Sequence, residues 1–204
     1  MIKKLLSVLS LVTVGFFSNA YSINYVETIE EENIIDKTPN LEFRLEAKSR
    51  TSPLRKTEFY FKNNPYRSVF LENEIIVTGD NVIKATMSAD ENGFPTINIE
   101  LDSDGTQAMI NATEGNIGRR LAVVLVEEIT KTSFDEEGKD IEEKWIVKQV
   151  ISNAVIQAVL GAKIRISGLG STQEARDLAL QLNVRALEAS KKARQELKWF
   201  ERYH

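Results

Sequence analysis

The sequence predicts an α+β fold, with a mixed or antiparallel sheet, helices packed on it and a long C-terminal helix. Two observations carry this prediction. Short segments between residues 41 and 167 alternate apolar and polar side chains and are separated by turn-forming residues, which is typical of strands. From residue 171 onward, apolar residues recur instead every three or four positions, which is typical of a helix.

The first strands are predicted from alternation. Leu41–Leu45 alternates apolar and charged residues, which predicts a half-buried strand. Residues 46–67 are basic and polar and contain two prolines, so we expect a loop there, with room for one short strand around Phe59. Alternation over Val69–Val77 predicts another strand, and the chain should turn at residues 78–80.

A hairpin and a helix follow. Residues 90–93 lie between two strand-like runs, 82–87 and 96–101, and predict a hairpin turn. Asp102 is the first of several N-cap candidates for a helix that should end near Ala112.

The next strands differ in character. Leu121–Val126 is a continuous apolar run, which predicts a strand buried on both faces. The acidic residues 135–140 should form a solvated hairpin loop before a strand over Trp145–Val150. Ile164–Ser167 alternates once more, and Gly168 should end that strand.

The C-terminal helix is the longest predicted element. Ser171 and Glu174 form an S-x-x-E capping box, and no Gly or Pro interrupts residues 172–204. At 1.5 Å per residue such a helix would be about 48 Å long. Its apolar stripe comprises Ala175, Leu178, Leu182, Ala186, Ala189, Ala193, Leu197 and Phe200.

The N-terminus has the pattern of a secretory signal peptide. Lys3 and Lys4 precede an apolar stretch, Leu5–Phe17, and small residues then stand at the positions required for cleavage after Ala20. Ser22 is the second candidate, and an uncleaved anchor is the alternative. The apolar stretch is shorter than the roughly 20 residues that cross a bilayer comfortably. We therefore expect residues 1–22 to be removed and the remaining chain, with no membrane span, to be periplasmic.

The composition excludes several function classes. The sequence contains no Cys and a single His, His204, which excludes disulfides, cysteine nucleophiles, His-based triads and His-ligated metal sites. A net charge of −4 argues against nucleic acid as a partner. No Ser, Lys or carboxylate stands in a nucleophile–base arrangement, so we expect no enzyme, no cofactor and no metal.

Local motifs that suggest ligands have simpler interpretations. Asp102–Gly105 resembles the start of a calcium loop, but the later ligand positions hold Thr106, Ala108 and Ile110, which favours a helix N-cap. Residues 168–171 are rich in Gly, but no Lys-Ser/Thr pair follows, which favours a strand-to-helix turn over a phosphate loop. Trp145 is more often a core residue than a stacking ligand.

A family resemblance rests on several blocks in a fixed order. The blocks are Leu41–Leu45, Val77–Asp80, Asn98–Gly105, Thr113–Val124, Val150–Ile156, Ile164–Gly168 and Glu174–Ala179. Together they resemble the first periplasmic domain of SecD, a subunit of the SecDF accessory complex of the bacterial Sec translocase. The resemblance covers about residues 38–187.

The resemblance implies an α+β domain with a base and a head like those of SecD. It also implies that the head contacts a preprotein emerging from the channel and holds it against backsliding. Family members couple that movement to the proton gradient through membrane helices. Here we expect no such helices, so proton coupling by this chain alone is excluded.

The predicted division follows from the resemblance and the departures from it. Residues 1–22 form the signal peptide, 23–37 an acidic leader that is mobile or a short helix, and 38–80 a partial base region. Residues 81–187 form the head, and 188–204 a helical extension in place of the strand that returns to the base in the family.

Two function classes remain. The first is a non-catalytic module that binds unfolded or extended polypeptide, or a Sec translocon component, in protein export. For it we single out the helix-to-strand junction, Thr113, Gly115, Asn116, Gly118 and Arg119, although its glycines equally fit a tight turn.

The alternative is a structural or regulatory envelope protein that docks on a partner, or on a second copy, through its C-terminal helix. The docking residues would be Ala193, Leu197, Trp199 and Phe200. Between projection of this helix and packing on the incomplete base, we favour packing, because the base must cover apolar surface.

Overall fold

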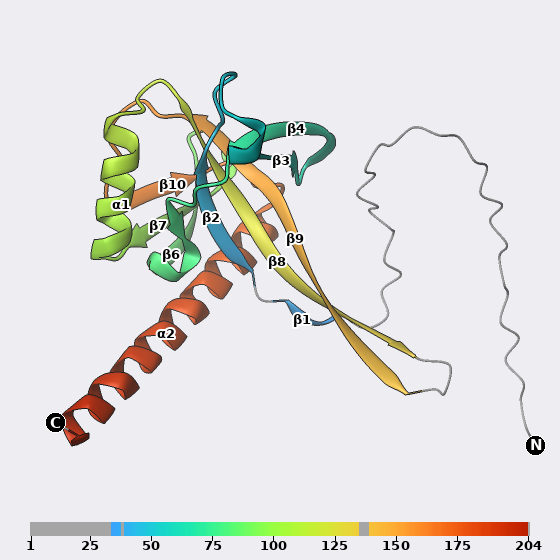
Figure 1. Ribbon diagram of the computed structural model, residues 1–204, viewed down its shortest axis with the longest axis vertical. Coiled ribbons are helices and arrows are strands. Elements are labelled where there is room, and N and C mark those ends of the chain that lie inside the picture. The colour runs from blue at the N-terminus through green and yellow to red at the C-terminus, as the bar shows by residue number, and fades with distance from the viewer. Residues whose placement is uncertain (1–33, 38, 135–138, 204) are drawn as a thin grey trace, which may run out of the picture. The chain divides into compact units, whose positions relative to one another are not determined.

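The computed structural model describes residues 34–37, 39–134 and 139–203 (Figure 1). The predicted α+β class is confirmed. In chain order the elements are β1 (Ile34–Lys37), β2 (Asn40–Leu45), the 3-10 helix η1 (Pro53–Arg55), β3 (Lys56–Phe61), β4 (Asn64–Glu72), β5 (Val77–Thr78), the 3-10 helix η2 (Gly79–Asn81), β6 (Val82–Ala89), β7 (Pro95–Leu101), α1 (Ser103–Glu114), β8 (Arg120–Phe134), β9 (Asp140–Val155), β10 (Lys163–Ile166) and α2 (Thr172–Tyr203).

The larger of two sheets is mixed. Its strands follow the order β4-β3-β9-β8-β2-β5, and β1 pairs with β8. β8 and β9 form a long antiparallel hairpin, and β2 lies antiparallel on the other side of β8, with Phe43 opposite Val123. β3 pairs with β9 in parallel, through Phe61 and Val150.

The smaller sheet is antiparallel, in the order β10-β7-β6. Ile99 in the central strand lies opposite Ala85 on one side and Ile164 on the other. The predicted hairpin turn between β6 and β7 is confirmed: the Asp90 carboxylate accepts two backbone N–H groups, and Gly93 has a φ of 82°. Only a residue without Cβ adopts such an angle without strain.

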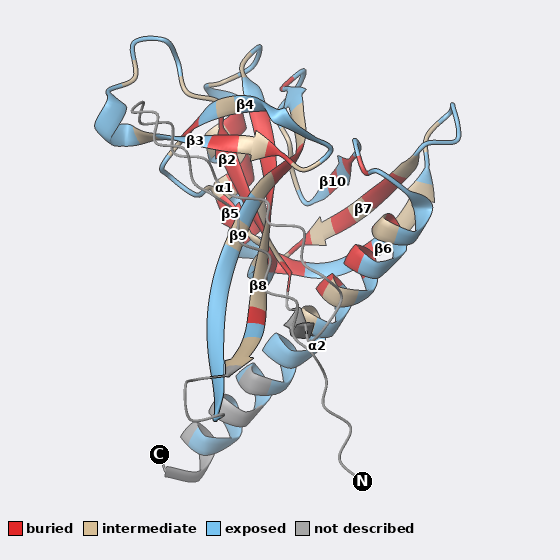
Figure 2. Cartoon of the chain, turned by 90° about the vertical axis from the view of Figure 1, so that its right-hand side faces the viewer, coloured by how far each residue is buried: buried red, intermediate tan, exposed pale blue. Residues whose placement is uncertain are grey.

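The main hydrophobic core is built from both sheets and both helices (Figure 2). The large sheet contributes the alternate residues Leu41, Phe43 and Leu45, all buried, together with the inward side chains of β8. The small sheet contributes the inward face of β7, including Ile97 and Ile99. Alternation along each strand therefore selects the core face, as side-chain geometry requires.

The two helices begin as predicted. Asp102 caps α1, since its carboxylate accepts the Gly105 N–H at 2.7 Å. At α2, the Ser171 hydroxyl accepts the Glu174 N–H at 3.1 Å, but the Glu174 carboxylate reaches back to the N–H of Gly170 rather than Ser171. In a standard capping box the glutamate side chain accepts the N–H of the N-cap residue. Here it accepts the N–H of the residue before the N-cap.

A second, smaller core lies on the opposite face of the large sheet. Its members are Phe59, Phe61, Leu71, Ala122, Val124 and Val150, which come from β3, β4, β8 and β9. The prediction that residues 121–126 form a strand covered on both faces is confirmed for Leu121 through Leu125. The short strand expected around Phe59, within the loop predicted over residues 46–67, is found as β3. The loop prediction is wrong for residues 64–67, which begin β4, and β3 and β4 form a hairpin that supplies this core.

The prediction that β2 is half-buried is also wrong. Both Glu42 and Arg44, on the charged face of the strand, are buried. Arg44 Nε donates to Glu42 Oε2 at 2.9 Å, and Lys148 Nζ donates to Glu42 Oε1 at 2.6 Å. Arg44 also donates to the carbonyl oxygens of Glu72 and Asn73, at 3.2 and 2.5 Å. Burial is the largest influence and raises the pKa of Glu42, but these charged donors outweigh it and the net pKa is lowered.

Several predicted element bounds differ from the structure. β8 and β9 are far longer than the predicted strands over residues 121–126 and 145–150. The predicted strand over residues 69–77 is split into β4 and β5. Of the predicted leader, residues 34–37 form β1, while residues 23–33 and the signal peptide lie outside the described residues. Strands of a solvent-exposed hairpin need no apolar face. The distribution of apolar residues therefore does not mark where such strands end.

Candidate functional site

The predicted polypeptide-binding residues begin with Thr113, at the last turn of α1. Its side chain is fully buried. The hydroxyl donates to the Met109 carbonyl oxygen at 2.7 Å and accepts the N–H of Leu160 at 3.0 Å. Thr113 therefore ties α1 to the loop before β10, and a ligand on the surface cannot contact it.

The two glycines of the junction have different environments. Gly118 has a φ of 86°, and its N–H donates to the Ile156 carbonyl oxygen at 2.9 Å. Gly115 ends α1 with a negative φ, and a Cβ at that position would meet open space. A tight turn explains Gly118 fully, whereas the structure gives no reason for a glycine at Gly115.

Arg119 connects the junction to the large sheet. Its guanidinium donates to Asn116 Oδ1 at 2.7 Å, to the Glu46 carbonyl oxygen at 2.7 Å and to Glu72 Oε1 at 2.5 Å. Asn116 in turn donates to the Ala112 carbonyl oxygen at 2.8 Å. Both side chains are partly exposed but already engaged, so a ligand would have to compete with these contacts.

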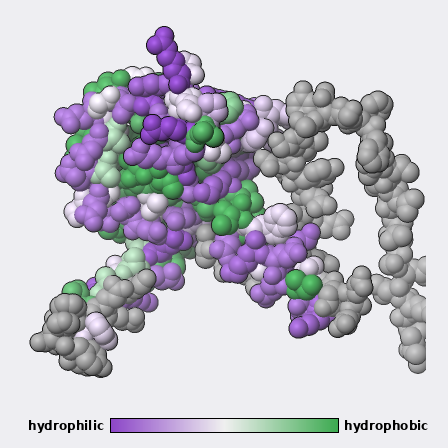
Figure 3. Space-filling view, viewed as in Figure 1, coloured by the Kyte–Doolittle hydropathy of each residue, from purple (hydrophilic) through white to green (hydrophobic). Residues whose placement is uncertain are grey.

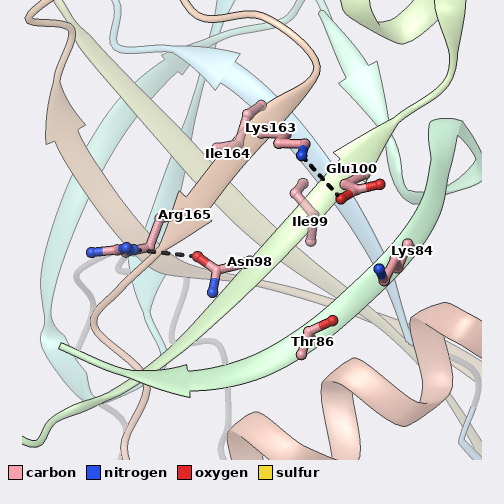
Figure 4. A pocket seen from close by; sticks show the side chains of 8 residues that line it. All are labelled: Lys84, Thr86, Asn98, Ile99, Glu100, Lys163, Ile164 and Arg165. Carbon is pink, nitrogen blue, oxygen red and sulfur yellow. Dashed lines mark hydrogen bonds and ion pairs between the residues drawn. The ribbon is translucent and has the colours of Figure 1, made fainter.

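A shallow hollow of about 460 Å³ lies on the outer face of the small sheet (Figure 4). The main core is on the other face of this sheet. The lining residues come from all three strands and are Lys84, Thr86, Asn98, Ile99, Glu100, Lys163, Ile164 and Arg165. Such a surface suits an extended, polar ligand better than a compact apolar one, since ligand pockets for small molecules are deeper and mostly apolar.

The hollow carries more positive than negative charge. Lys84, Lys163 and Arg165 face one carboxylate, Glu100. Figure 4 shows Lys163 directed toward Glu100, with Nζ 3.6 Å from Oε1, and Arg165 directed toward Asn98, with Nε 3.3 Å from Oδ1. Among the described contacts, no carboxylate pairs with Lys84 or Arg165, so the hollow has a net charge of +2, three cations against one anion.

Sequence reasoning did not single out these residues, although part of the signal was present. Alternation in each of the three strands places the polar positions on one face. Glu100 lies opposite Lys84 across the predicted β6–β7 hairpin, whereas the register that places it opposite Lys163 joins strands separated by a helix and by the long hairpin. That register is set by the tertiary fold and cannot be read from local patterns.

The predicted docking residues lie on the second half of α2. Ala193, Leu197 and Trp199 are exposed, the last two at 65% and 60%, and the side chain of Phe200 lies outside the described part. Leu187, just before this segment, is 55% exposed. Figure 3 shows hydrophobic and hydrophilic atoms interspersed along the described surface of this helix.

The packing of this half of α2 on the base, which we favoured, is therefore not found. The last fully buried residue of α2 is Leu182, and the contacts of the helix with β6 and η2 continue to Asn183 and Arg185. Beyond them Ala189 and Ala193 are exposed, and Figure 1 shows the helix extending past the small sheet.

No group of three or more His, Asp or Glu side chains could hold a metal ion in the part of the chain that the structure describes. Within the same residues, no helix has the length and apolar character to cross a membrane.

Comparisons with known proteins agree on one family. The model of the family described as "SecDF, P1 head subdomain" matches residues 56–189. The protein translocase subunit SecD of Pseudomonas aeruginosa is 40% identical over 170 residues, which is 80% of this chain and 27% of that protein. SecD of Escherichia coli K12 is 34% identical over 169 residues, 79% of this chain and 27% of that protein. The chain thus spans about a quarter of the length of these relatives.

Solved structures of SecDF are also similar to this chain. One, described as "Structure and function of a membrane component SecDF that enhances protein export", has a TM-score of 0.47 and 22% identity, and covers 72% of this chain and 63% of that one. Another, of SecDF in a super-membrane-facing form, has a TM-score of 0.48 and 23% identity, with coverage of 72% and 19%.

The blocks that suggested SecD lie within residues 56–189, which the family model matches, except Leu41–Leu45, which precedes them. The chain belongs to the family of the SecDF P1 head subdomain.

Proposed function

We propose that this chain is a non-catalytic periplasmic module of protein export that binds extended polypeptide. The match of residues 56–189 to the SecDF P1 head subdomain carries this proposal. The relatives are protein translocase subunits, and the SecDF structure is described as a membrane component that enhances protein export. A Sec translocon component is the partner that this kinship suggests.

The proposed division of the chain keeps a signal peptide over residues 1–22, a leader, a partial base over 38–80, a head over 81–187 and a helical extension over 188–204. The family match supports a head, although it begins at residue 56, inside the proposed base. Base and head share the main core, in which Phe43 and Ile97 both take part. We therefore expect the two parts to unfold together.

The proposed route of binding is strand addition. An extended polypeptide can add to a sheet edge through main-chain hydrogen bonds, which depend little on its sequence. The small sheet has edges at β6 and β10, beside the hollow. Gly115, Asn116, Gly118 and Arg119 stay as a second proposed contact region. We expect weak affinity, with a Kd of about 1 µM or higher.

The test uses the chain purified from the periplasmic fraction. An unfolded exported protein is titrated against it, with the same protein in its folded form as the control. Binding of the unfolded form alone supports the proposal, and absence of binding for both forms contradicts it. N-terminal sequencing of the same material checks cleavage after Ala20, whereas a chain that begins at Met1 in the membrane fraction excludes it.

Docking through α2 is the second proposed function. It is supported by the exposure of Leu197 and Trp199 on the second half of α2. Under this proposal, Leu197→Asp should abolish capture of one stoichiometric partner, or self-association, without affecting the titration with unfolded protein. The matched control is Leu180→Asp, which changes an equally exposed leucine on the first half of α2.

A further inference from the structure

We propose that β10 is the strand edge to which polypeptide adds, and that this site prefers segments with acidic side chains at alternate positions. The inference rests on the proposed function and specifies its site and its preferred ligand. Three observations lead to it: the direction of the free backbone groups of β10, the occupation of the opposite edge, and the charge of the hollow.

The first observation concerns the backbone of β10. The Leu101 N–H donates to the Ala162 carbonyl oxygen at 2.8 Å, so residue 162 directs its polar groups toward β7. In an antiparallel pair this direction alternates along the strand. Residues 164 and 166 therefore also face β7, whereas the N–H and C=O groups of Lys163 and Arg165 face the outer edge. Two residues with free donors and acceptors are thus available to an added strand.

The second observation is that the other edge of the small sheet is occupied. Asn183, on α2, accepts the N–H of Ala85 at 2.9 Å and donates to the Ala85 carbonyl oxygen at 2.7 Å. Its side-chain amide therefore makes the two hydrogen bonds that a neighbouring strand would make at this position. α2 packs along β6, so an extended chain meets an obstacle there that β10 does not have.

The third observation is the match between geometry and charge. The side chains of Lys163 and Arg165 are two positions apart and so lie on one face, the face of the hollow. Alternate side chains of an added strand would lie directly opposite them, with Cβ atoms about 5 Å apart. Lys84 extends the positive charge across the sheet, and the single carboxylate, Glu100, does not balance it. Carboxylates at alternate positions of the ligand complement this pattern.

Charged side chains on a short edge strand have a second known role, which is to prevent another strand from adding to that edge. The two explanations predict opposite results for an acidic peptide. As protection against pairing, Lys163 and Arg165 would leave acidic, neutral and basic peptides equally unbound at β10.

The experiment compares three extended peptides that carry Glu, Gln or Lys at every second position, titrated at low salt against the chain purified from the periplasmic fraction. We expect the Glu peptide to bind about tenfold more tightly than the Lys peptide, since two exposed ion pairs contribute roughly that factor. The preference should disappear in 1 M salt, where screening acts within about 3 Å.

Variants of the protein test whether the preference for the Glu peptide depends on Lys163 and Arg165. Lys163→Glu with Arg165→Glu should invert the preference, whereas Lys191→Glu with Lys198→Glu, which makes the same change of net charge on the exposed part of α2, should preserve it. Far-UV circular dichroism confirms that both variants are folded. A preference that survives in the first variant, or is lost equally in both, overturns the inference.

Modified peptides test the backbone contacts. In the Glu peptide, all N–H groups of the Glu residues point to one edge, and those of the intervening residues to the other. N-methylation of one of these two sets should abolish binding and methylation of the other should not. If neither set matters, strand addition at β10 is wrong.

The outcomes also separate this inference from the proposed function. If unfolded exported protein binds while the three peptides show no difference, the module binds polypeptide at another place. If neither the peptides nor the unfolded protein binds, both proposals are wrong.

Discussion

β2 and β10 have the same alternating pattern, yet their charged faces have opposite environments. In β2, Glu42 and Arg44 are buried beneath the β3–β4 hairpin and the connection that follows it. In β10, Lys163 and Arg165 are exposed on the outer face of the small sheet. Alternation predicts which side chains share a face, whereas coverage of the second face depends on segments far away in the sequence.

The largest effect should come from a charge in the doubly covered strand. Val124 is fully buried in the second core, together with Phe59, Phe61 and Leu71 of the β3–β4 hairpin. Val124→Asp buries a carboxylate without a partner and should lower the free energy of unfolding by about 4 kcal/mol or more. Urea denaturation measures this loss.

The matched control for Val124→Asp is Ile146→Asp, on β9, where the side chain is 66% exposed. Its effect should stay within about 0.5 kcal/mol. Equal losses for the two variants would mean that the second face of β8 is not covered as the structure has it.

The next effect compares the two charged faces directly. Glu42→Gln leaves Arg44 and Lys148 without their carboxylate and should cost about 3 kcal/mol, because breaking a buried ion pair leaves uncompensated charge. Glu100→Gln removes the exposed pair with Lys163 and should cost about 0.5 kcal/mol at most. A cost for Glu42→Gln as small as that for Glu100→Gln would show that the β2 face is solvated.

A smaller effect is expected at a single amide. Asn183→Ala should raise the hydrogen-exchange rate of the Ala85 N–H about tenfold, since it removes one hydrogen bond. Amides of β7, which pair on both sides within the sheet, serve as the internal control. An unchanged rate at Ala85 would mean that α2 covers this edge without Asn183.

The pH dependence follows from the lowered pKa of Glu42. A carboxyl whose pKa is lower in the folded than in the unfolded state stabilises the fold above its ordinary pKa of 4.5. This contribution is lost as the pH falls below 4.5 and through the lower value in the folded protein. Melting temperatures between pH 6 and pH 2 should therefore fall less steeply in Glu42→Gln than in the parent, and parallel curves would contradict the assignment.

The smallest effect should come from the end of α2. Deletion of residues 188–204 should leave the melting temperature within about 2 °C of the parent, because Ala193, Leu197 and Trp199 are exposed. Leu182→Ala, in the buried stripe, should instead cost about 2 kcal/mol or more. A large loss on deletion would restore our sequence-based expectation that this segment packs on the base.

Local patterns predicted most of the main core and both helices. The Asp102 cap, the hairpin at Asp90–Gly93 and the buried run from Leu121 each depend on residues close together in the sequence. A strand around Phe59 was expected, but its pairing with β4 in a hairpin was not, because the exposed residues and Pro65 at the start of β4 resemble a loop. Its importance comes from Phe59, Phe61 and Leu71, which pack on strands about 50 to 90 positions later.

The candidate site was less predictable than the fold. Glycines drew attention to the Thr113–Arg119 junction, but Thr113 is buried and Gly118 serves a turn. The hollow also depends on the pairing of β10 with β7, which places Lys163 opposite Glu100 and which no local pattern specifies. Sequence reasoning identified glycines with unusual backbone freedom. The structure instead shows a charged surface on the small sheet, whose residues are brought together by the pairing of its strands.

The pairing of β2 with β8 has a consequence for how the chain acquires its structure. Phe43 lies opposite Val123, which is 80 positions further along the chain (123 minus 43). A chain synthesised from its N-terminus exposes Leu41 and Phe43 well before the strand that will cover them exists. Contacts of such long sequence separation form late and slow the folding reaction, during which uncovered strands can pair wrongly. The first core strand in the sequence therefore cannot pair with β8 until most of the chain has been made, and until then Leu41 and Phe43 are open to wrong pairing.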